Sequence, residues 1–373
     1  MSEKTYCAHY LSKYLPITEN WIYRIIINHH DFNPIVLCRK KDNLHLFPFS
    51  GIFCLYDFNL ISRLYEIVLF KILGYFIFFK KTCIKNKVKI LHVHFGYQGV
   101  KFTGLKRKLR LPMICSFYGY DAFTYPRINN NIKKYRKLFR YADKILVLGP
   151  YMKEELVKSG CQEDKIVIQH LGIDTGKIKF IERNFSVNKN MRFLIASSFV
   201  PKKGIDLAIK ALSEFREKYN FTLDIIGDGP LKNDILKLID DLKMNDQIHL
   251  HGYKPYDFFI ELAYTCDVFI QASRTAANND KEGTPMAIVD AMATGLPVIS
   301  TKHSDIPEMV IEDVTGFLAE ENDLKSLTGA FQKLFNNIEK LSAISTNCRE
   351  RVENEFNCEK QTLKLEKIYR SLI

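Results

Sequence analysis

Short apolar runs rich in β-branched and aromatic residues alternate with helical patterns along most of this 373-residue chain. A run that is apolar on both faces, with helices before and after it, is typical of a parallel sheet covered by helices on both sides. The helical pattern is clear over 205–215, where Ala208, Ala211 and Leu212 recur at steps of three and four. Nine runs predict strands: Lys89–Val93, Met113–Phe117, Lys144–Leu148, Lys165–Gln169, Arg192–Ser197, Thr222–Gly227, Gln247–His251, Asp267–Gln271 and Pro297–Thr301.

The alternation is interrupted once, by the polar, lysine-rich stretch Thr175–Asn190. Since a domain usually has about 100–200 residues, we divide the chain into a first Rossmann-like domain, residues 1–180, and a second, residues 181–356. The apolar pattern of 357–373 predicts a last helix, which we assign to the first domain. Ligands of such sheets bind beyond the carboxyl ends of the strands, so the site is expected in strand-to-helix loops.

The most apolar run, Ile67–Phe79, contains Lys71 and is shorter than the ~20 residues that span a bilayer. We interpret it as a buried core helix, with a helix lying on a membrane surface as the alternative. The N-terminus lacks the pattern of a secretory signal. The nine cysteines are scattered without a Cys-x-x-Cys pair, which favours a reducing, cytoplasmic compartment.

The net charge of +12 is distributed unevenly. Residues 1–180 carry 30 Lys and Arg against 13 Asp and Glu, a net +17, whereas residues 181–373 carry 24 against 29, a net −5. This asymmetry indicates an anionic partner for the first half, unless the lysines serve only solubility. Anionic lipid and phosphorylated substrates both qualify; nucleic acid is not expected, because no recognition motif accompanies the charge.

The most informative segment is EGTPMAIVDAMATGLPV, residues 282–298. Thr284 is a good N-cap and Pro285 a favoured first helical residue. The backbone amides of Met286 and Ala287 then lack partners within the helix, and with the helix dipole they suit a diphosphate. Two carboxylates, Glu282 and Asp290, flank this helix start and suit the hydroxyl groups of a sugar nucleotide.

This string closely resembles the signature of the family-four retaining glycosyltransferases of the GT-B fold, and the resemblance continues through Pro297–Glu308 and Gly316–Leu318. It implies an α/β protein with two Rossmann-like domains facing each other across a cleft and a C-terminal helix that crosses back. In the family, the Glu and an acid eight positions later bind donor sugar and ribose. Here these are Glu282, next to Gly283, and Asp290, which replaces the usual Glu.

The loop after the first strand of the second domain, Ala196–Asp206, resembles the family's diphosphate-binding loop. Lys203, just before Gly204, matches the family's Lys, whereas Ser198 stands where an Arg is usual, with Lys202 as a possible substitute. A fixed ammonium stabilises the charge that grows on a leaving diphosphate. A further segment, His251–Tyr253, resembles the loop along the base pocket, where backbone near Tyr253 reads the base and its ring is expected to be buried.

The first domain resembles the family more thinly, and there the acceptor should bind. His92–Gly96 resembles a loop facing the cleft, with His94 and Gly96 as candidate acceptor contacts, and 15–22, with Thr18, resembles the first acceptor loop. In 116–121, Tyr118 replaces the family's catalytic His, and Asp121 either orients the loop or binds acceptor hydroxyls. A phenol is a poor base near neutral pH, but the proposed front-face mechanism needs no strong enzyme base.

The resemblance therefore implies a metal-independent hexosyltransferase without a cofactor. It would move a sugar from a UDP- or GDP-linked donor to a glycan or lipid-linked acceptor in cell-surface polysaccharide or lipopolysaccharide synthesis. No Asp-x-Asp motif, which would hold a metal under the diphosphate, occurs in the chain. The basic stretch Lys101–Arg110 suggests a peripheral location on the inner face of the cell membrane. Alternatives are a nucleotide-sugar epimerase or phosphorylase on the same fold, and a non-catalytic sugar-nucleotide-binding protein.

Overall fold

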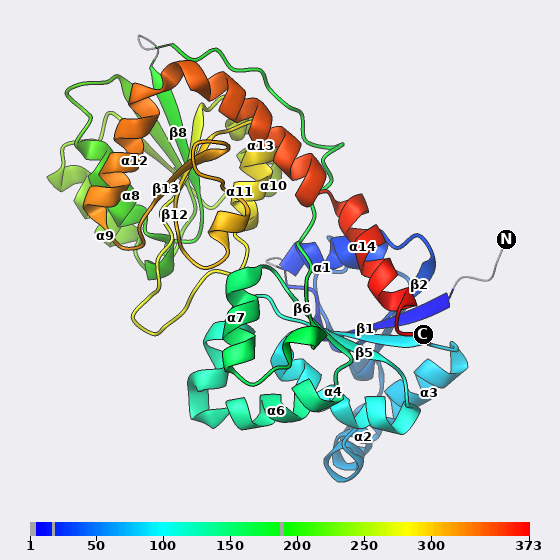
Figure 1. The fold of residues 1–373 in the computed structure, drawn as a ribbon. Coiled ribbons are helices and arrows are strands. Elements are labelled where there is room, and N and C mark those ends of the chain that lie inside the picture. Colours follow the sequence, from blue (N-terminus) through cyan, green and yellow to red (C-terminus); the bar gives the residue numbers. More distant parts are fainter. Residues whose placement is uncertain (1–4, 17–18, 187–189) are drawn as a thin grey trace. The chain divides into compact units, whose positions relative to one another are not determined.

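The computed structural model describes residues 5–16, 19–186 and 190–373, and they form two compact units (Figure 1). The first unit contains Met1–Gly172 and Cys358–Ile373, and the second contains Ile173–Asn357. The first boundary thus lies before the predicted one at residue 180. The reason is local, because Ile173 already pairs with the second unit's last residues: its backbone N–H donates to Phe356 O at 2.8 Å.

The first unit is built on a seven-stranded, all-parallel sheet in the order β3-β2-β1-β4-β5-β6-β7. The strand order reverses at β1, whose two neighbours in the sheet are β2 and β4. The strands are β1 (Thr5–Tyr14), β2 (Phe32–Lys41), β3 (Ile52–Cys54), β4 (Ile90–His94), β5 (Met113–Ser116), β6 (Lys144–Val147) and β7 (Ile166–Ile168).

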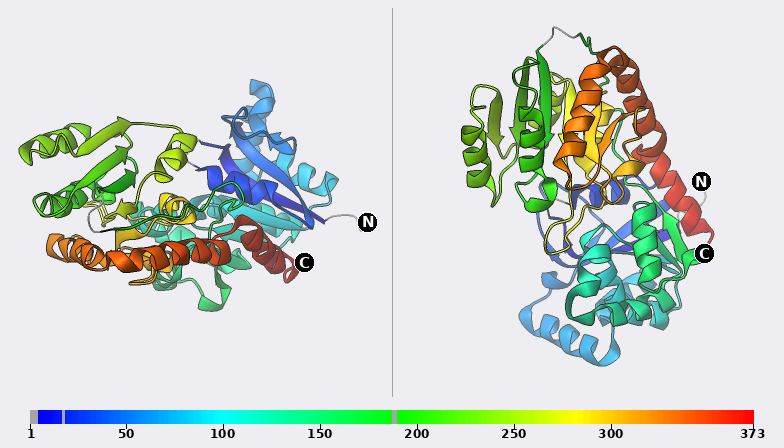
Figure 2. Two further views of the ribbon diagram at one scale, coloured as in Figure 1. Left: turned by 90° about the horizontal axis from the view of Figure 1, so that it is seen from above. Right: turned by 60° about the vertical axis from the view of Figure 1, so that its left-hand side comes forward.

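Helices cover both faces of this sheet (Figure 2). They are α1 (Asn20–Ile27), α2 (Leu60–Leu73), α3 (Ile77–Lys85), α4 (Gly96–Leu109), α5 (Tyr120–Phe123), α6 (Ile132–Tyr141), α7 (Pro150–Lys158) and α14 (Cys358–Arg370). The last of these, red in Figure 1, lies beside α1 and buries Leu365 and Tyr369 in the core under β1, β4, β5 and β6. The predicted C-terminal helix therefore completes the first unit's core.

The second unit repeats this plan with six parallel strands in the order β10-β9-β8-β11-β12-β13. Its strands are β8 (Met191–Ala196), β9 (Phe221–Ile226), β10 (Ile248–Gly252), β11 (Val268–Gln271), β12 (Val298–Thr301) and β13 (Gly316–Ala319). Its helices are α8 (Ile205–Ser213), α9 (Lys232–Asp241), α10 (Tyr256–Ala263), α11 (Met286–Ala293), α12 (Leu324–Asn336) and α13 (Leu341–Glu355). Both units are doubly wound α/β domains.

All nine predicted strands are confirmed, and no strand end differs from the prediction by more than one residue. Four strands, β1, β2, β3 and β13, have no counterpart among the predictions. The strand β1 is instructive: His9, Ser12 and Lys13 interrupt its apolar pattern, yet most of the strand is buried because it lies in the middle of the sheet.

The interpretation of Ile67–Phe79 as a buried core helix is wrong. The run is divided between α2 and α3, because Gly74 ends α2 in the left-handed conformation with φ of 77°. Along α2, large apolar side chains are exposed instead of buried, among them Ile61 at 80% and Ile72 at 73%. The apolar run indicated helical structure, but what covers a helix depends on its neighbours in space.

Two helical glycines allow the packing around α2 to be tested with one kind of substitution. A Cβ at Gly104 in α4 would lie 2.1 Å from Gly74 O, whereas a Cβ at the exposed Gly329 in α12 meets nothing within 4 Å. Alanine favours a helix over glycine by about 1 kcal/mol, but overpacking costs about 1–3 kcal/mol. We expect Gly104→Ala to lower the free energy of unfolding and Gly329→Ala to raise it, as measured by urea denaturation. Equal effects of the two changes would contradict the close approach of α4 to Gly74.

Candidate active site

The strongest candidate site in the second unit lies where the strand order reverses, between β8 and β11. The loop that leaves β8 crosses the end of β11 so closely that a Cβ on Gly204 would lie 1.8 Å from Ala272 O. Gly204 has φ of 60°, a conformation that glycine adopts without strain. This contact fixes the position of Lys203, the residue just before it.

Lys203 and Glu282 meet at this point. Lys203 Nζ lies 2.8 Å from Glu282 Oε1, and the two side chains are 15% and 8% exposed. Burial by itself would raise the pKa of Glu282, but Lys203 and, more weakly, Lys202 outweigh it and hold that pKa below its ordinary value. The sequence named both residues, and the structure places an ionised carboxylate against a lysine ammonium.

The backbone of Glu282 is also held. Its N–H donates to His303 Nε2 at 3.0 Å, and its carbonyl accepts from Ser304 Oγ at 2.9 Å. Since Nε2 accepts, the proton of a neutral His303 sits on Nδ1, which lies 2.8 Å from Glu321 Oε2. Glu321 in turn accepts the N–H of Thr275, which follows β11. The sequence did not single out His303, Ser304 or Glu321 as site residues.

Helix α11 begins immediately after this segment. It starts at Met286, one residue later than predicted, so Pro285 and not Thr284 occupies the N-cap position. Pro285 keeps an extended ψ of 95°, and its carbonyl accepts from Ile288 N at 2.9 Å. The first two helical amides, those of Met286 and Ala287, remain the ones that precede the hydrogen-bonded turn.

Two predicted donor-site residues lie further from the Lys203–Glu282 pair. Asp290 has a partner that the sequence did not show, and Tyr253 is not in the environment that was predicted. Asp290 is buried within α11, and its Oδ1 accepts a hydrogen bond from Tyr256 OH at 2.8 Å. Tyr253 is 72% exposed, so the expectation that its ring is buried is wrong.

In and around the loop after β8, basic side chains form ion pairs with nearby carboxylates. Ser198 is exposed, and Lys202 Nζ pairs with Asp280 Oδ2 at 3.0 Å. Arg274, which follows β11, donates to Pro201 O at 2.9 Å and to Asp206 Oδ1 at 2.8 Å. Arg274 therefore holds the loop that carries Lys203, a role no local signal in the sequence indicated.

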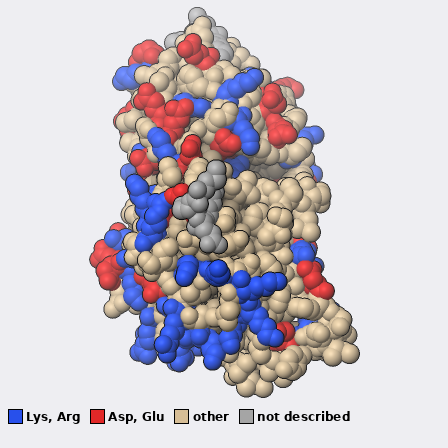
Figure 3. Space-filling model, turned by 90° about the vertical axis from the view of Figure 1, so that its right-hand side faces the viewer, with Lys and Arg blue, Asp and Glu red and all other residues tan. Residues whose placement is uncertain are grey.

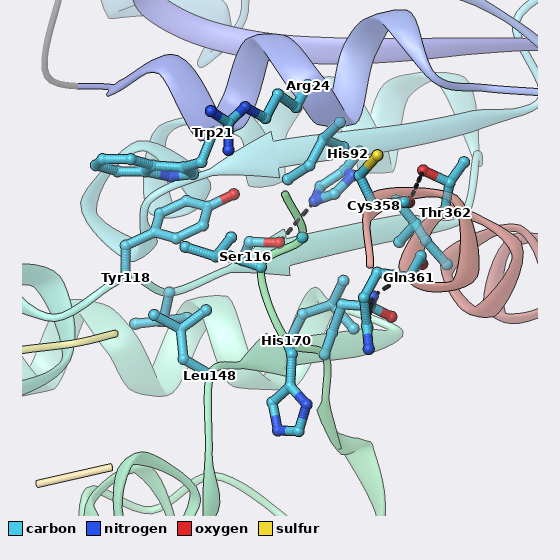
Figure 4. Close-up of a pocket in the computed structure, with 17 residues that line it drawn as sticks. Trp21, Arg24, His92, Ser116, Tyr118, Leu148, His170, Cys358, Gln361 and Thr362 are labelled. Carbon is cyan, nitrogen blue, oxygen red and sulfur yellow. Dashed lines mark hydrogen bonds between the residues drawn. The ribbon is translucent and has the colours of Figure 1, made fainter. Parts of the chain in front are cut away.

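The first unit has a pocket of its own at the carboxyl ends of β4 to β7, shown in Figure 4. Tyr118 and Trp21 lie beside each other on one side of it, with ring centroids 6.0 Å apart. The start of α14 forms another wall through Gln361 and Thr362. The sequence predicted Tyr118 here, and Trp21 lies in the predicted acceptor loop 15–22, but the α14 residues were not predicted.

His94 lies behind Tyr118. Its Nδ1 is 2.6 Å from Tyr118 OH and its Nε2 is 3.0 Å from His9 Nδ1, and the side chain is fully buried. Because both ring nitrogens are engaged, the structure places His94 where it acts through Tyr118 and does not touch a ligand. Burial raises the pKa of Tyr118 well above its ordinary value, so the phenol keeps its proton.

Asp121 is buried and clamps the loop that carries Tyr118. Its carboxylate accepts the backbone N–H of Gly96 at 2.8 Å, of Tyr118 at 2.9 Å and of Gly119 at 3.1 Å. Burial raises the pKa of Asp121 to about 6, although these donors oppose the shift. Of its two predicted roles, the structure shows the orienting one. Thr18, the remaining acceptor candidate, lies outside the described residues.

Two doubly wound domains follow each other in the chain, and ligands of such domains bind beyond the carboxyl ends of the strands. Comparisons with known proteins agree. The family model described as Glycosyltransferase Family 4 matches residues 30–177 of this chain, and the family model described as Glycosyl transferases group 1 matches residues 177–351.

The relatives and solved structures belong to the same class. The chain is 31% identical over 278 residues to the putative colanic acid biosynthesis glycosyltransferase WcaL of Escherichia coli, covering 73% of this chain and 68% of WcaL. It is 31% identical over 271 residues to the amylovoran biosynthesis glycosyltransferase AmsK of Erwinia amylovora, covering 72% and 66%. These matches thus span about two thirds of each relative's length.

Among solved structures, HepE of Anabaena in complex with UDP superimposes with a TM-score of 0.79 at 17% identity, over 99% of this chain and 100% of HepE. The chain belongs to the glycosyltransferases of the GT-B fold, with a family 4 segment followed by a group 1 segment.

The buried pair Lys203–Glu282 predicts a pH-dependent effect on stability. Removing one partner of such a pair costs about 3 kcal/mol, so Lys203→Met should destabilise the second unit at pH 7. Glu282 has a lowered pKa in the wild-type protein, so it stabilises the fold above its unfolded pKa of about 4.3 and this contribution is lost as the pH falls through the lower folded pKa. In Lys203→Met the carboxyl pKa rises, and stability should therefore recover between pH 7 and pH 5.

Thermal denaturation at both pH values checks this expectation. The control is Lys203→Met combined with Glu282→Gln, which removes both charges and should recover most of the stability at pH 7. If Lys203→Met alone is as stable as the wild type at pH 7, Glu282 does not depend on Lys203.

Proposed function

We propose that the protein transfers a sugar from a UDP- or GDP-linked donor to a glycan or lipid-linked acceptor in cell-surface polysaccharide synthesis, with retention of the anomeric configuration. The observation that carries this proposal is the buried Lys203–Glu282 pair next to the start of α11. The names of WcaL and AmsK, and the UDP in the HepE complex, support the class of donor and pathway.

On the donor side, the diphosphate becomes the partner of Lys203 and of the Met286 and Ala287 amides. The donor sugar hydroxyls donate to the Glu282 carboxylate, which is already ionised and held in place. Positive charge that is fixed before the reaction stabilises the diphosphate as it leaves, and needs no reorganisation at that moment. Asp290 is positioned on the same helix for the ribose, with Tyr256 fixing one of its oxygens.

We further propose that this transfer needs no divalent metal. The sequence has no Asp-x-Asp motif, and the described donor loop supplies cationic side chains and helix amides instead. Lys202, although paired with Asp280, lies close enough to lower the pKa of Glu282 and adds to the positive potential of the site.

On the acceptor side, the pocket of the first unit offers the Tyr118 hydroxyl and the Trp21 ring. Aromatic faces and hydroxyl groups suit a sugar, which has apolar C–H faces and polar edges. The leaving diphosphate takes the proton of the acceptor hydroxyl in the proposed front-face mechanism. Tyr118, which keeps its own proton, then positions a neighbouring hydroxyl of the acceptor by a hydrogen bond.

A membrane surface is the expected location of a lipid-linked acceptor, and we propose that α2 binds it. Its exposed apolar side chains follow one side of the helix: Leu60, Ile61, Leu64, Tyr65, Val68 and Ile72. Figure 3 shows a face of the first unit on which Lys and Arg side chains gather beside uncharged surface. Apolar side chains that insert and basic ones that meet anionic headgroups are typical of an interfacial helix. The protein would then be cytoplasmic and peripheral on the inner face of the membrane.

Within the described residues, none of the helices has both the length and the apolar character needed to cross a bilayer.

A panel of UDP- and GDP-sugars tests the proposed donor chemistry. We expect one donor to raise the melting temperature and to support transfer to an acceptor that EDTA leaves unaffected. Glu282→Ala and Lys203→Ala should each lower kcat about 100-fold, the order found when one fixed group that stabilises transition-state charge is removed. NMR of the product should show the donor's anomeric configuration.

The panel also separates the alternatives. An epimerised nucleotide sugar without transfer, or a sugar 1-phosphate formed only with inorganic phosphate, would replace the proposal by an epimerase or a phosphorylase. Binding without turnover of any donor would indicate a non-catalytic protein. Restoration of activity by a divalent ion after EDTA would refute metal-independent transfer.

Vesicle sedimentation tests the membrane face. A side chain buried in the bilayer interface contributes about 1.5 kcal/mol, so Ile61→Ser combined with Ile72→Ser should weaken binding to anionic phosphatidylglycerol vesicles about 100-fold. Leu236→Ser, on the exposed side of α9 in the second unit, is the matched control and should bind like the wild type. Undiminished binding of the α2 variant would place the contact elsewhere.

A further inference from the structure

A buried chain of side chains connects the pocket of the first unit with α14. It begins at Tyr118 OH, which lies 2.6 Å from His94 Nδ1. His94 Nε2 lies 3.0 Å from His9 Nδ1, and His9 Nε2 lies 3.1 Å from His29 Nε2. The chain ends at Glu366 in α14, whose Oε1 lies 3.1 Å from His29 Nδ1.

The sheet register explains how the histidines meet. His9 in β1 is the register partner of His92 in β4, and His94 lies two residues further along β4 on the same face. All of these rings, and the Glu366 side chain, are buried. The histidine and Glu366 side chains are shielded from solvent, so their hydrogen bonds are made within the protein.

The end at Glu366 fixes the direction of every hydrogen bond. Glu366 Oε1 also accepts the backbone N–H of His30 at 2.8 Å and of Asp31 at 3.1 Å. Burial would raise the pKa of Glu366, but His29 and the His30 N–H outweigh it and lower that pKa, so the carboxylate is ionised and accepts only. His29 must therefore donate through Nδ1.

With His29 donating through Nδ1 and all three histidine rings neutral, only one arrangement of protons along the chain is left. His29 Nε2 accepts from His9 Nε2–H, His9 Nδ1 accepts from His94 Nε2–H, and His94 Nδ1 accepts from Tyr118 O–H. Burial lowers the pKa of His9 and of His94 well below the ordinary value, and neighbouring histidines lower it further, so both rings are neutral. The Tyr118 proton then points away from the pocket and its lone pairs face the pocket.

One added proton reverses the chain. If His29 carries protons on both nitrogens and pairs with Glu366, its Nε2–H donates to His9 Nε2, His9 Nδ1–H donates to His94 Nε2, and His94 Nδ1–H donates to Tyr118 O. The Tyr118 O–H must then turn toward the pocket. No bond other than these N–H and O–H bonds changes, and the added proton resides on His29.

We propose that His94, His9 and His29 are positioning residues that, anchored by Glu366, set whether Tyr118 accepts or donates a hydrogen bond in the pocket. With the chain neutral, Tyr118 accepts, and it orients a ligand hydroxyl by taking that hydroxyl's hydrogen bond. With one proton added, Tyr118 donates and the ligand hydroxyl loses its acceptor. The role in sugar transfer rests on the proposed function, whereas the hydrogen-bond direction does not.

Other titratable and charged groups lie around the chain. Beside the histidines they are Cys7 in β1, 3.7 Å from His9 Nε2, His92 in β4, His30 and Asp31 after α1, and Tyr369 and Arg370 in α14. Around Tyr118 they are Glu19, Cys115 and Asp121. His92 has its own partners, Tyr369 OH at 2.5 Å and Ser116 Oγ at 2.7 Å, and Ser116 also hydrogen-bonds to Tyr118.

The same side chains offer an alternative to be tested. Ligand atoms of Cys7, His9 and His29, and of His9, His92 and His94, lie within 4.8 Å of one another, so each group could hold a metal ion. A metal requires lone pairs on both facing nitrogens, whereas the chain requires one proton between each pair. The His9–His94 separation of 3.0 Å is that of an N–H···N hydrogen bond.

Nitrogen NMR of protein labelled with ¹⁵N-histidine reads the tautomers directly, with resonances assigned from single His→Gln variants. At neutral pH we expect protons on His29 Nδ1, His9 Nε2 and His94 Nε2. In Glu366→Gln the amide can donate as well as accept, so the fixed acceptor at the end of the chain is lost. We expect a second set of tautomers to appear in that variant, with His9 and His94 protonated on Nδ1.

Tyr369→Phe, on the same buried face of α14, removes the His92 contact and should leave the three tautomers unchanged. The proposal is overturned if His9 or His94 carries its proton on Nδ1 at neutral pH in the wild-type protein, or if Glu366→Gln leaves all three tautomers as they are. A stoichiometric zinc ion in the purified protein would overturn it as well. None of these measurements needs turnover, so a failure of the chain is distinguished from a failure of the proposed transferase.

Discussion

The structure depends on one constraint, the reversal of strand order in a parallel sheet. Where β8 and β11 are neighbours, their following segments leave toward opposite sides, and the space over the two carboxyl ends is left to side chains and loops. There Gly204 passes over Ala272 and brings Lys203 to Glu282. The same reversal between β1 and β4 sets His9 beside His92 in the first unit.

Carboxylates hold the loops that carry the candidate site residues in both units. In the second unit, Glu321 accepts from Thr275 and pairs with His303, which in turn accepts the N–H of Glu282. In the first unit, Asp121 accepts three backbone N–H groups around Tyr118. A charge can be buried only where hydrogen bonds or an opposite charge compensate it. The loops that carry the functional side chains are therefore held by interactions that are costly to break.

The C-terminal helix contributes both apolar and charged side chains to the first unit. Leu365 and Tyr369 extend the core under the sheet, while Glu366 provides the only ionised end of the histidine chain within the described residues. Because α14 follows α13 of the second unit in the chain, the segment that fixes the polarity of Tyr118 is covalently joined to the unit with the donor-site candidates. The two candidate sites are thus connected covalently through the α13–α14 segment.

Local sequence determined the α/β class, nine strands, the family and the segment that carries Glu282, because apolar runs and a Thr-Pro helix start act over a few residues. It did not predict β1, whose polar residues conceal a central strand, nor the exposure of α2, since each depends on which elements surround it. Only the tertiary structure decided that Arg274 holds the donor loop and that His29 meets Glu366, 337 residues away. Such pairs are set by strand order and by a returning helix, and no pattern within a few residues encodes which distant side chains these bring together.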